Sequence, residues 1–287
     1  MFEITDKKTL SAGVHLFRIK APEIVNKHKA GQFVILRLHE KGERIPISVA
    51  DVDKRDGTLL LLVQEVGKTS EEMGTLKAGD GILDVVGPLG HPTELLENAT
   101  TVCVGGGIGI APVHCIAKAL KGKGNKVISI VGARTKELLT FQSELSKVSD
   151  ELIISTDDGS FGHKGFVTDI LLSLIQKGEK IDEVFAIGPV PMMRAVCKLT
   201  EGYKIKTTVS LNPIMVDGTG MCGACRATVG GVTKFACVDG PEFDGHKVDF
   251  AELTKRQKMY LKEETASREN FHKKHPSTCA CEVKHGR

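Results

Sequence analysis

The sequence predicts an antiparallel β-barrel and then a doubly wound α/β domain, followed by a small cysteine-rich domain and a basic helical tail. Three observations predict this: apolar residues alternate with period two near the N-terminus, strand and helix patterns alternate in the middle, and Gly and Cys gather later. The 287 residues suffice for two domains. We place the domain boundaries at 1–95, 96–211, 212–248 and 249–287.

The barrel is predicted from short runs in which every second residue is apolar. Turn residues such as Asp56-Gly57 separate the runs, and no long helical pattern interrupts them beyond a turn at 71–76. Period-two alternation is typical of strands with one face in a core. A small antiparallel barrel is the simplest arrangement for the runs at 14–19, 32–38, 45–50, 58–64 and 82–86.

The second domain is predicted from a change of rhythm after Pro92. Short apolar strands are expected at 101–104, 127–131, 152–155, 184–187 and 206–210. Helical spacing lies between them at 111–120, 141–147, 167–175 and 192–199. Strands that alternate with helices in this way form a parallel, doubly wound sheet.

Composition and the ends of the chain exclude several classes of protein. Hydrophobic residues are 41% and charged residues 26%, as in ordinary globular proteins. Aromatic residues are only 5%, which argues against a nucleic-acid stacking surface. The N-terminus lacks an apolar signal region, and no apolar run approaches the roughly 18 residues of a membrane helix. We therefore expect a cytoplasmic protein that binds neither nucleic acid nor membrane.

Positive charge gathers near the C-terminus. Residues 249–268 predict one charged helix, and the residues after it a mobile tail. We expect the helix to dock an acidic partner; the alternative is a helix folded back on its own domain.

A glycine-rich turn follows the first strand of the α/β domain. It comprises Gly105, Gly106, Gly107, Ile108 and Gly109 and leads into a helix. Glycines let the backbone approach a pyrophosphate, and a helix N-terminus favours negative charge. The turn stands where dinucleotides bind in doubly wound sheets; the alternative is an ordinary tight turn.

Two later stretches reach the same edge of the predicted sheet. Asp157 and Asp158 follow the third strand, and Gly188 and Met192 follow the fourth. The two carboxylates can accept hydrogen bonds from ribose hydroxyls and repel a 2′-phosphate, which favours NADH over NADPH. The alternative for the Asp pair is a turn or helix cap.

The cysteine segment, residues 212–248, predicts a metal centre. Cys222, Cys225 and Cys237 supply three thiolates, and Asp217 stands near the place where a fourth ligand of a plant-type binuclear iron-sulfur cluster is expected. Structural zinc is the alternative. So small a segment has little hydrophobic core and needs a bound metal or a cross-link for stability, which disfavours unligated thiols.

The remaining cysteines and a barrel motif are less specific. Cys103, Cys115 and Cys197 are expected in the core, and Cys279 and Cys281 lie in the tail. In the barrel, Arg44-Ile45-Pro46-Ile47-Ser48 and Gly67-Lys68-Thr69-Ser70 combine an Arg, hydroxyls and a Gly-Lys-Thr turn, which can hold phosphates. Surface turns contain such residues routinely.

The order of these motifs resembles the ferredoxin-NADP reductase superfamily. The motifs are RIPIS and GKTS, GPLG at 87–90, GGGIGIAP, DDGSFGHKG at 157–165 and the terminal cysteines. Within this superfamily, the chain resembles the iron-sulfur flavoprotein subunits. This group includes the electron-transfer subunit of dihydroorotate dehydrogenase B and the small subunits of NADH-dependent reduced ferredoxin:NADP oxidoreductases. The chain is more similar to the ferredoxin:NADP oxidoreductase subunits.

The resemblance implies three cofactor sites. FAD would lie against the barrel, with Arg44, Pro46, Ile47 and Ser48 near its ring or phosphates, Ser48 as the catalytic hydroxyl, and Gly67, Lys68 and Thr69 at its pyrophosphate. The second domain would bind NAD(H), and the cysteine segment a [2Fe-2S] cluster. Two residues depart from the pattern: Ile45 stands where the superfamily has Arg, and Asp217 where the group has Cys.

The implied function is electron transfer between NAD(H) and a partner. A hydride passes between NADH and FAD, and single electrons pass through the iron-sulfur cluster. The group implies a heterodimer with a large flavin and iron-sulfur subunit that handles NADP and ferredoxin by electron bifurcation. The alternatives are a dihydroorotate dehydrogenase B electron-transfer subunit and a zinc-stapled nucleotide-binding regulatory module.

Overall fold

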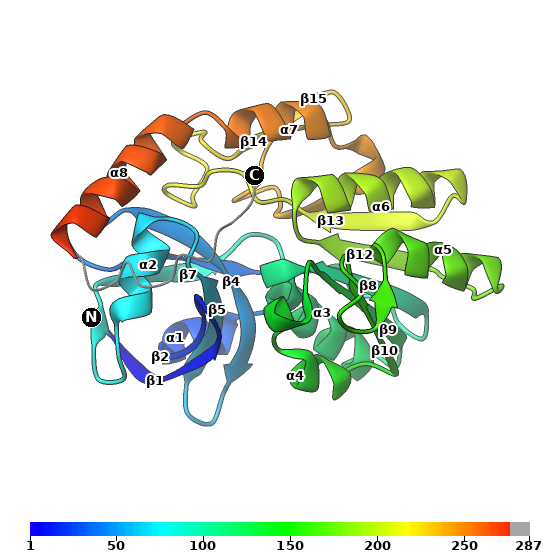
Figure 1. Cartoon of the computed structure of the whole chain (residues 1–287), viewed down its shortest axis with the longest axis horizontal. Coiled ribbons are helices and arrows are strands. Elements are labelled where there is room, and N and C mark those ends of the chain that lie inside the picture. The colour runs from blue at the N-terminus through cyan, green and yellow to red at the C-terminus, as the bar shows by residue number, and fades with distance from the viewer. Residues whose placement is uncertain (276–287) are drawn as a thin grey trace.

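The structure, a computed structural model, describes residues 1–275. The barrel and the α/β domain lie side by side, and the C-terminal part of the chain arches over both (Figure 1). The predicted positions of Cys279 and Cys281, and the end of the predicted mobile tail, lie outside the described residues. Within that described part, no helix is long and apolar enough to cross a membrane.

The first sheet is an antiparallel barrel, as predicted. Its strand order is β6-β1-β2-β5-β4-β3-β7. The edge strands β6 and β7 are separated in the chain by Leu83 alone, so the sheet must curl until its edges meet. The strands are β1 (Phe2–Ser11), β2 (Val14–Lys20), β3 (Phe33–Arg37), β4 (Arg44–Asp53), β5 (Thr58–Gln64), β6 (Gly81–Ile82) and β7 (Asp84–Leu89).

The barrel differs from the prediction in several features. Strand β1 was missed because Asp6, Lys7 and Lys8 interrupt its apolar alternation. The expected turn at 71–76 is part of helix α2 (Lys68–Thr75), which begins three residues earlier. A second short helix, α1 (Pro22–Lys27), covers the barrel core through Ile24 and Val25.

The second sheet is doubly wound, as predicted, with order β11-β10-β9-β8-β12-β13-β16. The direction of winding reverses between β8 and β12, which is where open parallel sheets bind ligands. Its strands are β8 (Thr100–Gly106), β9 (Lys126–Ala133), β10 (Glu151–Thr156), β11 (His163–Lys164), β12 (Glu183–Ile187), β13 (Lys206–Ser210) and β16 (Glu242–Asp244).

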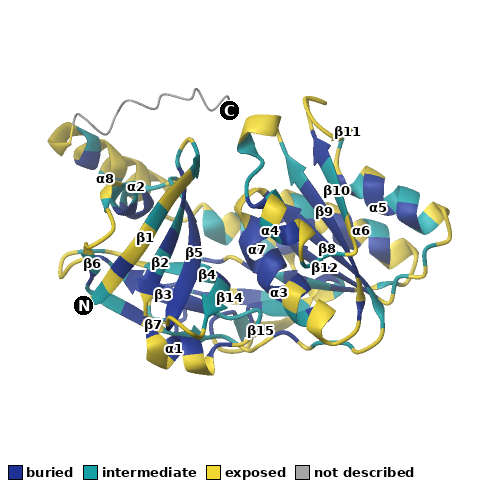
Figure 2. Ribbon diagram, turned by 90° about the horizontal axis from the view of Figure 1, so that it is seen from below, coloured by how far each residue is buried: buried dark blue, intermediate teal, exposed yellow. Residues whose placement is uncertain are grey.

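Helices cover both faces of this sheet and bury two apolar cores, visible as the dark strands of Figure 2. Helices α5 (Val167–Gln176) and α6 (Val190–Gly202) cover one face, and α3 (Ile110–Gly122) and α4 (Gln142–Ser146) the other. Cys103, Cys115 and Cys197 are buried, as predicted.

The two domains are joined directly through α3 and β4. The buried His114 lies with Nδ1 3.0 Å from the carbonyl oxygen of Ala50, and the Lys118 ammonium lies 2.8 Å from both carboxylate oxygens of Asp51. These contacts hold β4, the strand of the RIPIS motif, against the α/β domain.

The cysteine segment is less separate than the sequence suggested. It forms a hairpin of β14 (Arg226–Val229) and β15 (Val232–Phe235), and then adds β16 antiparallel to β13 of the α/β sheet. Its buried side chains pack on barrel strand β3. The segment therefore touches both larger domains.

The prediction of one helix over 249–268 is wrong. Helix α7 (Phe250–Gln257) ends at Gln257, and α8 (Leu261–Lys274) begins after a turn and includes residues 269–274, which were predicted to belong to the mobile tail. Phe250 and Leu253 anchor α7 in the core of the α/β domain, whereas α8 reaches the barrel. No Gly or Pro stands at the turn between α7 and α8, so tertiary contacts determine where the helix is interrupted.

Glu242, on β16, carries a pH-dependent contribution to stability. Burial, with the negative charges of Glu183 and Glu94, raises the pKa of Glu242 to about 7 although Thr93 Oγ1 donates a hydrogen bond to it at 2.8 Å. A pKa raised in the folded state means that this contribution is complete below about pH 4.5 and is lost as pH rises through 7.

We expect Glu242→Gln to stabilise the protein at pH 8 by about 1–3 kcal/mol and to change little at pH 5. The amide keeps an acceptor for Thr93 and removes the charge. Urea unfolding at both pH values measures the effect, with the exposed Glu151→Gln as control. Equal differences from wild type at pH 5 and 8 would contradict it.

Candidate functional site

A cavity of about 650 Å³ opens at the switch point of the α/β sheet and reaches the barrel. Gly106, Gly107 and Ile108 line it from the glycine-rich turn, and Asp157 and Met192 line it from the following strand ends. The barrel contributes Val14 and Gln64. A cavity of this size, at this edge, suits a dinucleotide whose reactive ring must reach a second group held by the barrel.

Glycine is required here because the backbone is crowded by its neighbours. A Cβ on Gly106 would lie 2.5 Å from Met192 Sδ, and one on Gly109 would lie 2.2 Å from the carbonyl oxygen of Ile187. Gly107 lines the cavity and has φ +55°, a left-handed conformation that favours glycine. The turn therefore keeps its backbone close to both the cavity and β12.

The structure divides the predicted nucleotide residues into two groups. Gly106, Gly107, Ile108, Asp157 and Met192 line the cavity. Gly105, Gly109 and Gly188 instead allow close packing of α3 and β12 against the turn.

Asp158 caps a turn, which was the alternative predicted for the Asp pair. Its carboxylate accepts hydrogen bonds from Ser160 Oγ at 2.6 Å and Ser160 N at 2.9 Å, and these bonds lower its pKa. The predicted preference for NADH therefore depends on Asp157.

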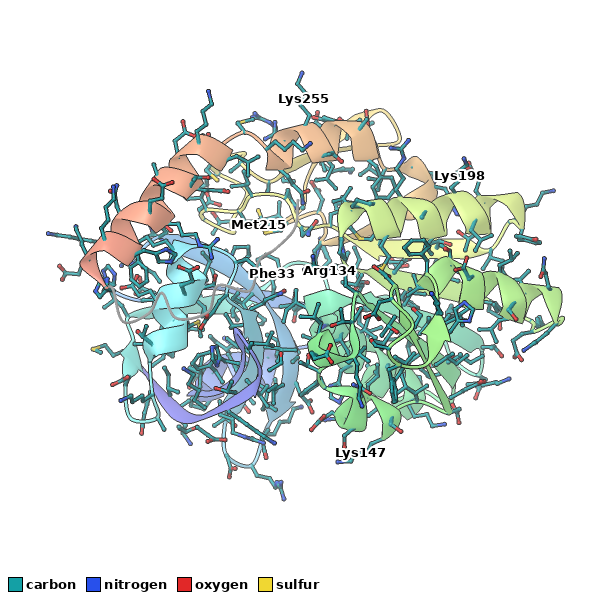
Figure 3. The ribbon with its side chains drawn as sticks, viewed as in Figure 1. Phe33, Arg134, Lys147, Lys198, Met215 and Lys255 are labelled. Carbon is teal, nitrogen blue, oxygen red and sulfur yellow. The ribbon has the colours of Figure 1, made fainter. Side chains whose placement is uncertain are left out.

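Sequence reasoning missed several cavity residues. Arg134, Thr140 and Phe166 line the cavity from loops after β9 and before α5. Figure 3 shows Arg134 on the side of the α/β domain that faces the barrel. Its position directly after β9 was a usable signal, because the ends of parallel strands share one edge.

The two barrel motifs meet at Glu43, the residue before β4. Thr69 Oγ1 donates to Glu43 Oε2 at 2.6 Å, and Lys68 Nζ lies 3.7 Å from Glu43 Oε1. Ser70 Oγ accepts from the amides of Val66 and Gly67, which fixes the loop before α2. Lys68 and Thr69 thus both contact one carboxylate at the start of α2, where the helix N-terminus also favours negative charge.

The flavin-ring part of the motif lies on β4. Pro46 and Ser48 are half-exposed, so a ligand can reach them, whereas Arg44 is exposed. Ile47 is also half-exposed, but its side chain packs against the barrel core. In the barrel sheet the residues from Pro46 to Ser48 pair with Ile35, Val34 and Phe33 of β3.

The cysteine segment brings two thiols together. Cys225 Sγ and Cys237 Sγ lie 3.1 Å apart, buried with Met215 against Phe33 and Ile35. Figure 3 labels Met215 and Phe33 of this group. Burial, followed by the contact with Cys225, raises the pKa of Cys237 to about 12. A thiol of this kind needs the positive charge of bound metal to become a ligand.

The other two predicted ligands lie on the neighbouring loop. Cys222 is exposed, and its backbone N–H donates to Asp217 Oδ2 at 2.8 Å. Asp217 Oδ1 accepts from Thr219 N, and these bonds hold the pKa of Asp217 below its usual value. Gly218, Gly220 and Gly223 have φ between +64° and +84°, which lets the loop curl tightly.

This donor set fits an iron-sulfur cluster better than a single ion. Three thiols are the soft donors that iron-sulfur clusters take, and a carboxylate can complete the set. A binuclear cluster spreads its ligands over two irons.

The three candidate sites follow the strand order of the barrel. Strand β5 contributes Gln64 to the cavity, its neighbour β4 carries Ser48, and the next strand, β3, packs on the cysteines. An antiparallel barrel joined to a dinucleotide-binding α/β domain defines the class of ferredoxin-NADP reductase-like flavoprotein oxidoreductases. The cysteine segment adds an iron-sulfur domain to this class.

Comparison with protein families agrees with this class. Residues 1–93 match an oxidoreductase FAD-binding domain and residues 103–198 an oxidoreductase NAD-binding domain. Residues 212–249 match the iron-sulfur cluster binding domain of dihydroorotate dehydrogenase B. The chain belongs to the family of dihydroorotate dehydrogenase B-type electron-transfer subunits, iron-sulfur flavoproteins that bind FAD and NAD. The iron-sulfur match also decides against the zinc-stapled module.

Individual relatives cover nearly the whole chain. A Thermotoga maritima homologue of the dihydroorotate dehydrogenase B electron-transfer subunit is 49% identical, over 94% of this chain and 95% of its own. The Fusobacterium nucleatum electron-transfer subunit is 31% identical, over 84% and 94%.

Solved structures agree with this assignment. A chain of an NADH-dependent reduced ferredoxin-NADP oxidoreductase, from a study of flavin-based electron bifurcation, is 48% identical with a TM-score of 0.89, over 94% and 98%. Phthalate dioxygenase reductase, 18% identical at a TM-score of 0.57, over 79% of this chain and 85% of its own, shares the fold.

Proposed function

We propose that this chain is the NAD(H)-oxidising small subunit of an electron-bifurcating NADH-dependent ferredoxin:NADP oxidoreductase. When bound, FAD exchanges a hydride with NAD(H), and the [2Fe-2S] cluster carries one electron at a time. A large flavin and iron-sulfur subunit takes the electrons and handles ferredoxin and NADP.

The roles of the chain's residues are positioning and electrostatic. The cavity at Gly106 and Gly107 holds NAD(H), and Asp157 accepts hydrogen bonds from a ribose and disfavours a 2′-phosphate. Ser48 hydrogen-bonds the flavin ring, and Gly67, Lys68 and Thr69 bind its pyrophosphate. Asp217 and the three cysteines hold the iron-sulfur cluster, as predicted from the spacing.

The order of the barrel strands is the observation that carries this proposal. Neighbouring strands β5, β4 and β3 contact the nucleotide cavity, the flavin motif and the cysteine pair in turn. Strands in a sheet lie about 5 Å apart, so this order supports a short path from NADH to the iron-sulfur cluster.

Sequence identity supports the bifurcating enzyme. The chain from the NADH-dependent reduced ferredoxin-NADP oxidoreductase structure is 48% identical to this one, whereas the Fusobacterium electron-transfer subunit of dihydroorotate dehydrogenase B is 31% identical.

Purification of the chain with its natural partner tests the proposal. We expect FAD, iron and acid-labile sulfide, flavin reduction by NADH faster than by NADPH, and a co-purifying subunit that reduces NADP. Zinc without labile sulfide would refute the cofactor assignment. Co-purification with a dihydroorotate-oxidising subunit would favour the alternative.

Asp217 offers a direct test of the ligand set. Because a carboxylate is a harder ligand than a thiolate, Asp217→Cys should retain an iron-sulfur cluster with a shifted reduction potential and visible spectrum. Redox titration and absorbance measure both, with the exposed Asp239→Asn, on the same segment, as control. An Asp217→Ala variant with unchanged spectrum and potential would show that Asp217 is not a ligand.

A further inference from the structure

Helix α8 crosses from the cysteine side of the molecule to the barrel and packs on α2, the helix whose first turn carries Lys68 and Thr69 (Figures 1 and 2). It is a polar helix with one buried side chain, Phe271. Its contacts with the barrel are therefore chiefly electrostatic.

The central contact is at Glu71, on the first turn of α2. Its carboxylate is only 10% exposed and is held by two side chains from α8. Arg268 Nε donates to Glu71 Oε1 at 2.6 Å, and His272 Nε2 lies 2.7 Å from Glu71 Oε2. A second contact runs from Ser267 Oγ to Glu43 Oε1 at 3.3 Å, the carboxylate that also touches Lys68 and Thr69.

A nearly buried carboxylate is an unusual neighbour for a phosphate site. Glu71 lies two residues after Thr69 on the same turn, so its negative charge would repel a pyrophosphate there. Helix α8 supplies the compensating charge.

We propose that Arg268 and His272 are positioning residues for FAD. The charge of Arg268 compensates Glu71 and His272 hydrogen-bonds it, which makes the first turn of α2 receptive to the cofactor's pyrophosphate. This inference rests on the proposed FAD site at Lys68 and Thr69. It gives the C-terminal helix a role within its own subunit, distinct from the docking role that its charge suggested.

The test measures the rate at which FAD leaves the full-length, cluster-loaded chain, followed by flavin fluorescence. We expect Arg268→Ala/His272→Ala to release FAD about tenfold faster or more, because a desolvated charge is left uncompensated. Adding Glu71→Gln to the double variant should return the rate to within about threefold of wild type, because the amide has no charge to compensate. Lys262→Ala, an exposed cation on the same helix, is the control and should leave the rate unchanged.

Three results would overturn the inference: an unchanged rate in the double variant, no rescue by Glu71→Gln, or an equal loss of iron-sulfur absorbance, which would mean general destabilisation. Lys68→Ala distinguishes a failure of the proposed role of α8 from a failure of the proposed FAD site. If it releases FAD faster while the double variant does not, the role of α8 is wrong and the FAD site stands; if it too binds FAD normally, the proposed site falls as well.

Discussion

Replacing Cys237 by serine is expected to remove the iron-sulfur cluster and to slow transfer to one-electron acceptors by about 100-fold or more, while NADH still reduces bound FAD. Cys237 lies beside Cys225 in the buried group that joins the cysteine segment to β3. A hydroxyl is a poor iron ligand, and its burial leaves a polar group without a partner. Visible absorbance, labile sulfide and stopped-flow reduction measure the effect.

Cys115→Ala is the matched control for this experiment. Burial raises the pKa of Cys115 to about 12, as it does for Cys237, but Cys115 lies in α3 outside the cysteine segment. It should keep the iron-sulfur cluster and both electron-transfer rates. A cluster retained in full by Cys237→Ser would remove Cys237 from the ligand set.

Replacing Gly109 by alanine is expected to destabilise the α/β domain by about 1–3 kcal/mol and to reduce flavin reduction by NADH about 100-fold. The new Cβ would meet the backbone of β12, which cannot rotate away as a side chain could. The start of α3 must then shift, and the cavity wall formed by Gly106 and Gly107 shifts with it.

Gly122→Ala controls for the general effect of adding a methyl group to α3. Gly122 has open space around it at the end of the same helix, so its replacement should be neutral or slightly stabilising. Thermal unfolding and NADH-driven flavin bleaching compare the two variants. Equal behaviour of both would show that the contact between Gly109 and β12 does not shape the site.

Much of the fold could be predicted because it follows from local patterns of apolar residues along the chain. Strands β5 and β13 begin and end where the periodicity placed them, and the doubly wound order followed from alternation of strands and helices. The glycine-rich turn was found because its backbone requires glycine at several neighbouring positions, and these glycines form a recognisable run in the sequence. Strand β1 and the break between α7 and α8 were missed, since charged side chains hid the first and tertiary contacts cause the second.

The sequence by itself determined the domain classes, the glycine turn, the Gly-Lys-Thr loop and the cysteine spacing, because each depends on residues that are close along the chain. Only the tertiary structure decided that Glu43, just before the RIPIS motif, contacts Thr69, that Asp157 lines the cavity while Asp158 caps a turn, and that Arg268 of α8 pairs with Glu71. These contacts join residues from different elements, and Glu71 and Arg268 are separated by 197 positions. Burial and charge compensation over such separations depend on how the domains pack, which no local pattern records.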